Sequence, residues 1–153
     1  MPEIAIGEAT SDEREWCAQL MAASEPWITL GRGLDQCRAA CARAEVRLFV
    51  ARDGVQACGF VLLHPRGVAG SPYIASLAVD PRWRGMGVGS QLLEYAESLA
   101  AETSRWIFLC VSSFNEAARR LYERRGYRQV GEFEDYVIDG ASEILMRKRL
   151  DRA

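Results

Sequence analysis

The chain has 153 residues, of which 49% are hydrophobic and 26% charged, the balance of an ordinary globular protein. Its formal net charge of −2 gives no bulk attraction to nucleic acid, so we predict no nucleic-acid partner. The apolar runs are too short to span a membrane, and the acidic first residues are unlike a signal peptide. We therefore expect a cytoplasmic protein without a membrane partner.

The cysteines argue against a metal or disulfide scaffold. The chain has five cysteines, none in a Cys-x-x-Cys pair, and a single histidine, His64. This set is unlike a zinc site or a disulfide framework, so we expect free thiols and no bound metal. Because the sequence contains no internal repeat, low-complexity stretch or linker, we predict one domain over residues 1–153.

Strand and helix patterns alternate along the chain. In order, they predict a strand at 3–9, helices at 10–24 and 34–44, two strands within 46–65, a strand at 72–79, a helix from 88 to 99, a strand at 106–111, a helix from 113 to 126, and strands at 127–138 and 141–150. The dipeptides Asp53-Gly54 and Asp139-Gly140 are typical of hairpins. This order predicts an α/β fold in which helices cover a mixed sheet.

Two details of the second half can be tested directly. The continuous apolar run at 106–111 predicts a strand that is buried on both faces. Ser113 and Glu116 have the spacing of a capping box, which predicts that Ser113 begins the helix that ends at Gly126.

A glycine-rich loop with two arginines lies between the strand at 72–79 and the next helix. Glycine allows an anion to approach the backbone, and a helix N-terminus offers unpaired N–H groups. The loop lacks the Gly-Lys-Ser/Thr of P-loop NTPases, and Ser90 stands where a dinucleotide-binding loop has its third glycine. The third type of phosphate-binding loop has the pattern Arg-x-x-Gly-x-Gly, which Arg84, Gly87 and Gly89 satisfy. The loop therefore favours a phosphorylated ligand.

A second motif follows at Asn115 to Tyr127, with the pattern Asn-x-x-Ala-x-x-Leu-Tyr-x-x-x-Gly-Tyr. Together the two motifs resemble the GNAT superfamily of acyl-CoA-dependent N-acetyltransferases, and the expected elements follow the family's order over essentially the whole chain. The resemblance implies a mixed, mainly antiparallel sheet of about seven strands with about four helices. It also implies that the sheet is splayed beside its central strand, where acetyl-CoA enters, and it allows a homodimer.

The resemblance also implies roles for individual residues. Backbone N–H groups of the central strand and the glycine loop are expected to bind the pantetheine and pyrophosphate of the cosubstrate acetyl-CoA. Tyr122 matches the tyrosine near the thioester sulfur and is the expected catalytic acid, although its helical spacing to Ala118 and Leu121 leaves a core role open. The expected cofactor-binding residues are Leu77, Ala78, Val79, Arg84, Gly85, Met86, Gly87, Val88, Gly89, Ser90 and Asn115.

The general base is left unassigned by the sequence. Cys110 stands where the ribosomal-protein branch of the family has a glutamate, which argues against that activity; a thiol in an apolar run is expected to be inert. The alternatives for the general base are an ordered water, Glu25 and Glu134.

The resemblance also implies contacts with the acceptor. In this fold the segment between the first two helices lines the acceptor cleft, which implies that Ser24 and Trp27 contact the acceptor.

These features predict an enzyme that transfers the acetyl group of acetyl-CoA to a primary amine of a small molecule or peptide, by direct attack in a ternary complex. One alternative is a non-catalytic acyl-CoA-binding sensor or partner-binding module. A dinucleotide-dependent oxidoreductase is the third hypothesis, and it would bind NAD(P) in place of coenzyme A.

Overall fold

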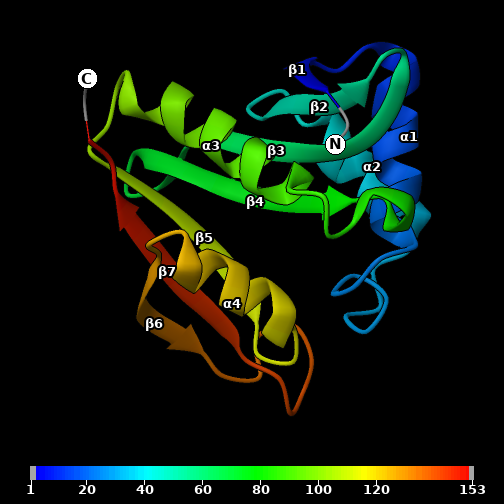
Figure 1. Ribbon diagram of the computed structural model, residues 1–153. Helices are drawn as coiled ribbons and strands as arrows, with labels where there is room; N and C mark the ends of the chain where they lie inside the picture. Colours follow the sequence, from blue (N-terminus) through cyan, green and yellow to red (C-terminus); the bar gives the residue numbers. More distant parts are fainter. Residues whose placement is uncertain (1–2, 152–153) are drawn as a thin grey trace.

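The computed structural model describes residues 3–151 (Figure 1). Its elements are β1 (Ile4–Glu8), α1 (Ser11–Ala22), α2 (Leu34–Ala42), β2 (Arg47–Asp53), β3 (Gln56–Val68), β4 (Ser71–Val79), the 3-10 turn η1 (Pro81–Trp83), α3 (Val88–Ala101), β5 (Trp106–Ser112), α4 (Glu116–Arg124), β6 (Arg128–Phe133) and β7 (Glu143–Arg149). The seven strands form one sheet in the order β1-β2-β3-β4-β5-β7-β6. All neighbours except β4 and β5 are antiparallel, which confirms the predicted mixed sheet.

The sheet divides between β4 and β5. These parallel strands pair at only two positions, Tyr73 with Phe108 and Ile74 with Leu109, and then diverge. Next to this point Ser76 pairs with Leu62 and Ile74 with Leu63, so Ala75 is an extra residue that bulges from the ladder. Beyond the bulge, β4 stays paired with β3, but among residues 3–151 it has no strand partner on its β5 side, which confirms the predicted splay.

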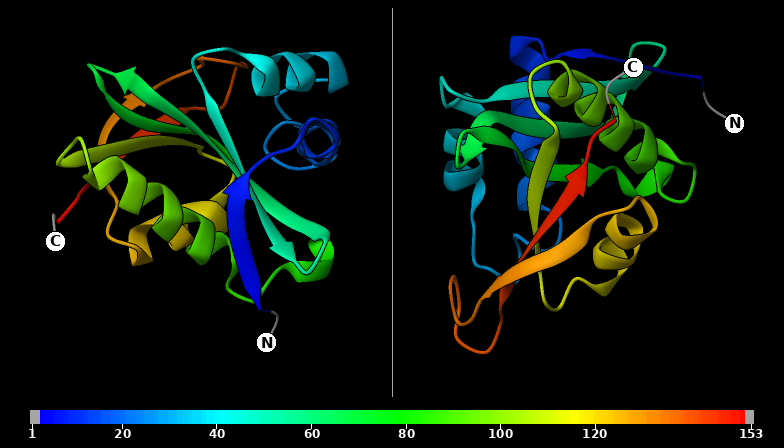
Figure 2. Two further views of the ribbon diagram at one scale, coloured as in Figure 1. Left: turned by 90° about the horizontal axis from the view of Figure 1, so that it is seen from above. Right: turned by 90° about the vertical axis from the view of Figure 1, so that its left-hand side faces the viewer.

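Helices cover both faces of the sheet, with α1 and α2 on one side and α3 and α4 on the other (Figure 2). Side chains of a strand point alternately to its two faces, so Phe49 and Val50 of β2 enter different cores. Both faces are apolar here, and β2 is therefore buried along a continuous run.

Strand β5 differs from its prediction because only one of its faces is buried. Ile107, Leu109 and Val111 lie in the core that includes α3, whereas Phe108 and Cys110 are partly exposed. The prediction of burial on both faces was wrong. On the second face Cys110 lines the cavity beside β4, and the Trp106 ring lies under the Arg147 guanidinium rather than under a helix. An apolar sequence run does not distinguish a second core from a cavity wall.

The predicted capping box at Ser113 and Glu116 was also wrong. Helix α4 has Asn115 as its N-cap, and the Asn115 side chain makes no capping hydrogen bond. The hydroxyl of Ser113 instead accepts a hydrogen bond from the backbone N–H of Ser142, at 3.0 Å. Ser113 thus ties the start of α4 to the chain before β7.

The final hairpin forms as predicted, but its loop is longer. Strand β6 ends at Phe133 rather than at residue 138, so residues 134–142 connect it to β7. Gly140 is the only glycine of this connection and has a φ of +84°, the left-handed conformation that its dipeptide signal predicts.

A buried carboxylate joins α3 to the chain after α4. Glu97, 8% exposed, accepts hydrogen bonds from the Tyr127 hydroxyl and the Lys148 ammonium group, both at 2.9 Å. The Arg125 guanidinium lies 3.7 Å from the same carboxylate. Lys148 is the only lysine in the sequence, and its ammonium group is thus paired with a buried carboxylate.

We predict that Glu97→Gln lowers the free energy of unfolding by about 2 kcal/mol, because it leaves partly buried cations without their carboxylate. Urea denaturation measures the change. The matched control is Arg120→Gln, whose contact with Glu116 is exposed and 4.0 Å long; it should cost less than about 0.5 kcal/mol. Equal effects of the two substitutions would contradict the role given to Glu97.

Candidate active site

The loop between η1 and α3 offers a series of unpaired backbone donors. None of the N–H groups from Gly85 to Ser90 donates to an acceptor within residues 3–151, and the first bond of the helix runs from Gln91 N–H to the Gly87 carbonyl, 3.1 Å. Gly85 and Gly87 have φ values of +77° and +82°, which glycine adopts without strain. The N-terminal end of the α3 dipole adds partial positive charge, so the loop is suited to an anion.

Two arginines flank this loop and are held differently. Arg84 donates through Nε to the Val79 carbonyl, at 3.1 Å, which ties the loop to the end of β4. Arg82 is paired with Asp80 and lies over the Trp83 ring. Arg84 has no carboxylate partner within the described residues, so its charge is available beside the free N–H groups.

The free edge of β4 continues from this loop. Leu77, Ala78 and Val79 pair with Val61, Phe60 and Gly59 of β3, and their opposite edge faces the gap toward β5. Unpaired strand backbone can form hydrogen bonds with an extended amide-containing molecule. Residues 80–84 join the two stretches and have backbone partners of their own, because Asp80 N–H donates to Cys58, Trp83 N–H to Asp80 and Arg84 N–H to Pro81. The predicted strand residues and loop residues thus offer free donors on either side of this turn.

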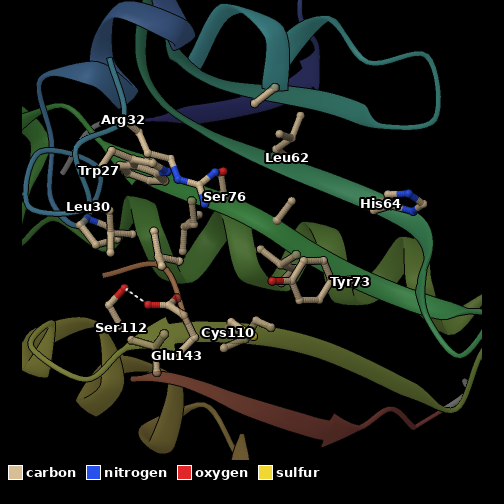
Figure 3. A pocket seen from close by; sticks show the side chains of 18 of the residues that line it. Trp27, Leu30, Arg32, Leu62, His64, Tyr73, Ser76, Cys110, Ser112 and Glu143 are labelled. Carbon is tan, nitrogen blue, oxygen red and sulfur yellow. Dashed lines mark hydrogen bonds between the residues drawn. The ribbon is translucent and has the colours of Figure 1, made fainter. Parts of the chain in front are cut away.

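A cavity of about 640 Å³ opens where β4 and β5 separate (Figure 3). Its walls come from the α1–α2 connection, the middle strands, α4 and the β6–β7 connection. Four residues predicted from the sequence line it: Trp27, Leu77, Asn115 and Tyr122. The structure thus brings together residues from three segments that are far apart in the chain, namely the α1–α2 connection, β4 and α4.

Ser24 lies elsewhere. It is 4% exposed, does not line the cavity, and donates its hydroxyl to the Leu20 carbonyl at 2.6 Å. This placement favours a role at the end of α1 and gives no support to the predicted acceptor contact. Glu25 and Glu134, weighed as bases, also lie outside the cavity wall, and Glu25 accepts hydrogen bonds from the backbone and hydroxyl of Thr29.

Tyr122 lies at the wall of the cavity with its hydroxyl protonated. Its ring packs edge-on against Tyr127, with ring centroids 6.0 Å apart. Burial raises the pKa of Tyr122 to about 12, and the hydroxyl has no hydrogen-bond partner within residues 3–151. A buried hydroxyl that remains protonated at neutral pH, and that no protein acceptor engages, can donate a hydrogen bond to a bound molecule.

Sequence reasoning missed Glu143. It is the only Asp or Glu among the residues that line the cavity, and its carboxylate accepts a 2.6 Å hydrogen bond from the buried hydroxyl of Ser112, its partner across the β5–β7 ladder. One signal was available in the sequence: side chains alternate between the two faces of a strand, so Glu143 and Leu145 of β7 lie on the same face, and both line the cavity. However, a glutamate at the start of a strand is usually solvated, and the sequence did not show which face meets a cavity.

Cys110 of β5 and Tyr73 of β4 lie beside each other at the cavity wall, next to the last paired positions of the two strands. Burial raises the pKa of the Cys110 thiol, and burial also raises the pKa of the Tyr73 hydroxyl. The thiol is therefore protonated and a poor nucleophile at neutral pH, as the sequence predicted. Its place is at the cavity wall rather than in the core.

Two further observations concern other site classes. Within residues 3–151, no cluster of three or more His, Cys, Asp or Glu side chains is arranged to hold a metal ion. Over the same described range, none of the helices combines the length and apolar character needed to cross a bilayer.

Comparisons with known proteins agree with this geometry. An uncharacterized N-acetyltransferase from Methanocaldococcus jannaschii is 38% identical over 86 residues, which are 55% of each chain, so the match spans about half of that relative. The N-alpha-acetyltransferase RimI of Mycobacterium tuberculosis is 28% identical over 155 residues, covering 95% of this chain and 92% of the relative.

A solved structure shows the same fold. Aminoglycoside 6'-N-acetyltransferase complexed with coenzyme A superposes with a TM-score of 0.80 at 18% identity, over 97% of this chain and 98% of that one. The sequence profile of the Acetyltransferase (GNAT) family matches residues 9–127, which include both motifs and most of the cavity wall. The chain belongs to the acetyltransferase (GNAT) family.

Proposed function

We propose that this protein is an acetyl-CoA-dependent N-acetyltransferase that transfers the acetyl group directly to a primary amine. Two unpaired stretches of backbone carry the proposal. They are the N–H groups from Gly85 to Ser90 and the free edge of β4, and β4 lines the cavity together with Tyr122. The compared relatives have acetyltransferase names, and one solved relative is a coenzyme A complex. One of these relatives is an N-alpha-acetyltransferase and another is an aminoglycoside acetyltransferase, so the relatives do not share one acceptor.

In this proposal the chain binds the cosubstrate mainly through its backbone. The N–H groups from Gly85 to Ser90 and the Arg84 guanidinium bind the pyrophosphate. The free edge of β4 at residues 75–79 binds the amides of pantetheine as a neighbouring strand would. Asn115, whose side chain does not cap α4, contacts pantetheine from the opposite wall.

The remaining groups act on the reaction itself. A backbone N–H of β4 polarises the thioester carbonyl, which makes its carbon more electrophilic. Glu143 accepts the proton that the amine loses on attack, and Ser112 holds the carboxylate in place. As the C–S bond breaks, the Tyr122 hydroxyl donates to the departing sulfur, so coenzyme A leaves as a stabilised thiolate or thiol.

Tyr122→Phe should lower kcat by about 100-fold while the Kd for coenzyme A changes little, because only the interaction with the leaving sulfur is lost. Thiol release from acetyl-CoA and calorimetric titration measure the two quantities. Tyr95→Phe is the matched control, since Tyr95 packs against Phe49 outside the cavity wall. A non-catalytic binding module would show the same affinity and no turnover in the wild-type protein.

Glu143→Gln should lower kcat by about 100-fold with coenzyme A affinity preserved, because an amide cannot accept the amine's proton. The control is Glu132→Gln, an exposed glutamate on β6 that does not line the cavity. Wild-type turnover in the Glu143 variant would show that water or another group acts as the base.

Gly87→Ala should weaken coenzyme A binding by about 10-fold, because a Cβ at φ +82° strains the loop and displaces its amides. It should also cost about 1 kcal/mol of stability. Gly131→Ala is the control: that strand glycine has no positive φ, and its nearest side-chain contact is an ordinary 3.9 Å. Unchanged affinity in the Gly87 variant would place the pyrophosphate elsewhere.

A further inference from the structure

We infer that the acceptor carries a carboxylate in addition to its amine, and that Arg32 binds this carboxylate. The inference rests on the proposed transferase function and names the substrate class of the same cavity. It is carried by the charges along the wall, which include one carboxylate, Glu143, and a guanidinium, Arg32, that has no ion-pair partner within residues 3–151.

The segment that carries Arg32 is held in a fixed conformation by its own backbone. Ile28 N–H donates to the Ser24 carbonyl at 3.1 Å, Leu30 N–H to Pro26 at 2.9 Å, and Arg32 N–H to Trp27 at 2.9 Å. These successive turns place Trp27, Leu30 and Arg32 side by side on the wall. The guanidinium is therefore presented by an ordered segment, although the residue itself is exposed.

Other ionic groups near Arg32 are already engaged. Glu25, the only acidic residue between α1 and α2, accepts hydrogen bonds from Thr29 and forms no ion pair with Arg32. Arg43, the second arginine on the wall, is paired with Glu45. Among residues 3–151 no carboxylate lies within ion-pair distance of Arg32, so its charge is free to meet one on a ligand.

Arg32 and Glu143 face the cavity from opposite sides of the gap. Figure 3 shows the Arg32 guanidinium directed toward Ser76 of β4, and Glu143 directed inward beside Ser112 on the β5–β7 side. A simple amine would use Glu143 alone. An acceptor that carries both charges would satisfy both groups, with its amine at Glu143 and its carboxylate at Arg32.

Apolar surface between these groups sets the character of the rest of the acceptor. Trp27 and Leu30 provide an indole and an aliphatic wall beside the guanidinium. A carbon chain or ring that separates the amine from the carboxylate would pack there. An amine and a carboxylate joined through such a group are the features of an amino acid. This amino acid is either free or an acidic residue near the N-terminus of a peptide.

Matched acceptor pairs test the inference. Thiol release from acetyl-CoA is measured with aspartate and asparagine amide, glutamate and glutamine amide, leucine and leucine amide, and short peptides that begin with Asp or Asn. The wild-type protein should favour the carboxylate member by about 10-fold or more in kcat/KM. If the protein prefers the carboxylate member only among the peptide pairs, the acceptor is a peptide. If it prefers the carboxylate member among the single amino acids, the acceptor is a free amino acid.

Arg32→Gln should lower kcat/KM for the carboxylate member by about 10-fold and leave the uncharged member and coenzyme A affinity unchanged. Arg32→Lys should restore part of the preference. Arg66→Gln, at an exposed position of β3 outside the cavity wall, is the control. Equal rates for both members of every pair, or a preference that survives Arg32→Gln, would overturn the inference while leaving the transferase function intact.

A total absence of thiol release would count against the transferase function, and a binding measurement then decides the role of Arg32. Calorimetry of N-acetylglutamate and its diamide with the coenzyme A-loaded protein needs no turnover. Binding of the acid to the wild-type protein but not to the Arg32→Gln variant supports the inference. Equal binding to both proteins, or no binding of the acid, contradicts it.

Discussion

The early end of the β4–β5 pairing is the constraint on which the rest of this molecule depends. A parallel ladder that stops after two residue pairs leaves strand backbone without hydrogen-bond partners in the middle of a sheet. The Ala75 bulge lies where the two strands diverge, and it bends β4 away from β5. The same divergence opens the cavity, so the unsatisfied backbone and the space for a ligand have one structural cause.

The buried contacts around Glu97 connect this opening to Tyr122. Tyr122 packs on Tyr127, and the Tyr127 hydroxyl is bound to Glu97 of α3, the helix whose N-terminus carries the free N–H groups. Lys148 of β7 binds the same carboxylate. The phosphate-binding end of α3, the proposed acid on α4 and the strand that begins with Glu143 are thus fixed relative to one another through a single buried charge.

Much of the fold could be predicted from the sequence because its signals are local. Asp53-Gly54 specifies a hairpin, and the glycines at 85 and 87 adopt the positive φ values that explain their presence. Arg84 and Gly87 indicate the loop, and the Asn115–Tyr127 motif indicates the family, because each motif is contiguous in the sequence. Trp27, Asn115 and Tyr122, which were predicted at the site, do meet at one cavity.

The remaining features depend on contacts between distant segments. Glu143 could not be identified as a site residue from the sequence, because its hydrogen-bond partner Ser112 lies on another strand and the sequence does not show that β5 and β7 pair. Ser113 has capping-box spacing, yet its hydroxyl is bound by Ser142. The apolar run of β5 predicts burial but cannot show which side faces a cavity. In each case a tertiary partner overrides the local pattern.

The most direct test of this account is a titration of isotope-labelled protein with coenzyme A, followed through the backbone amide resonances. The account predicts saturable shifts at the amides from Gly85 to Ser90 and along residues 75–79 of β4, because these donors gain acceptors only when the cosubstrate is bound. Saturable shifts confined to other regions, or the absence of any saturable shift, would contradict it.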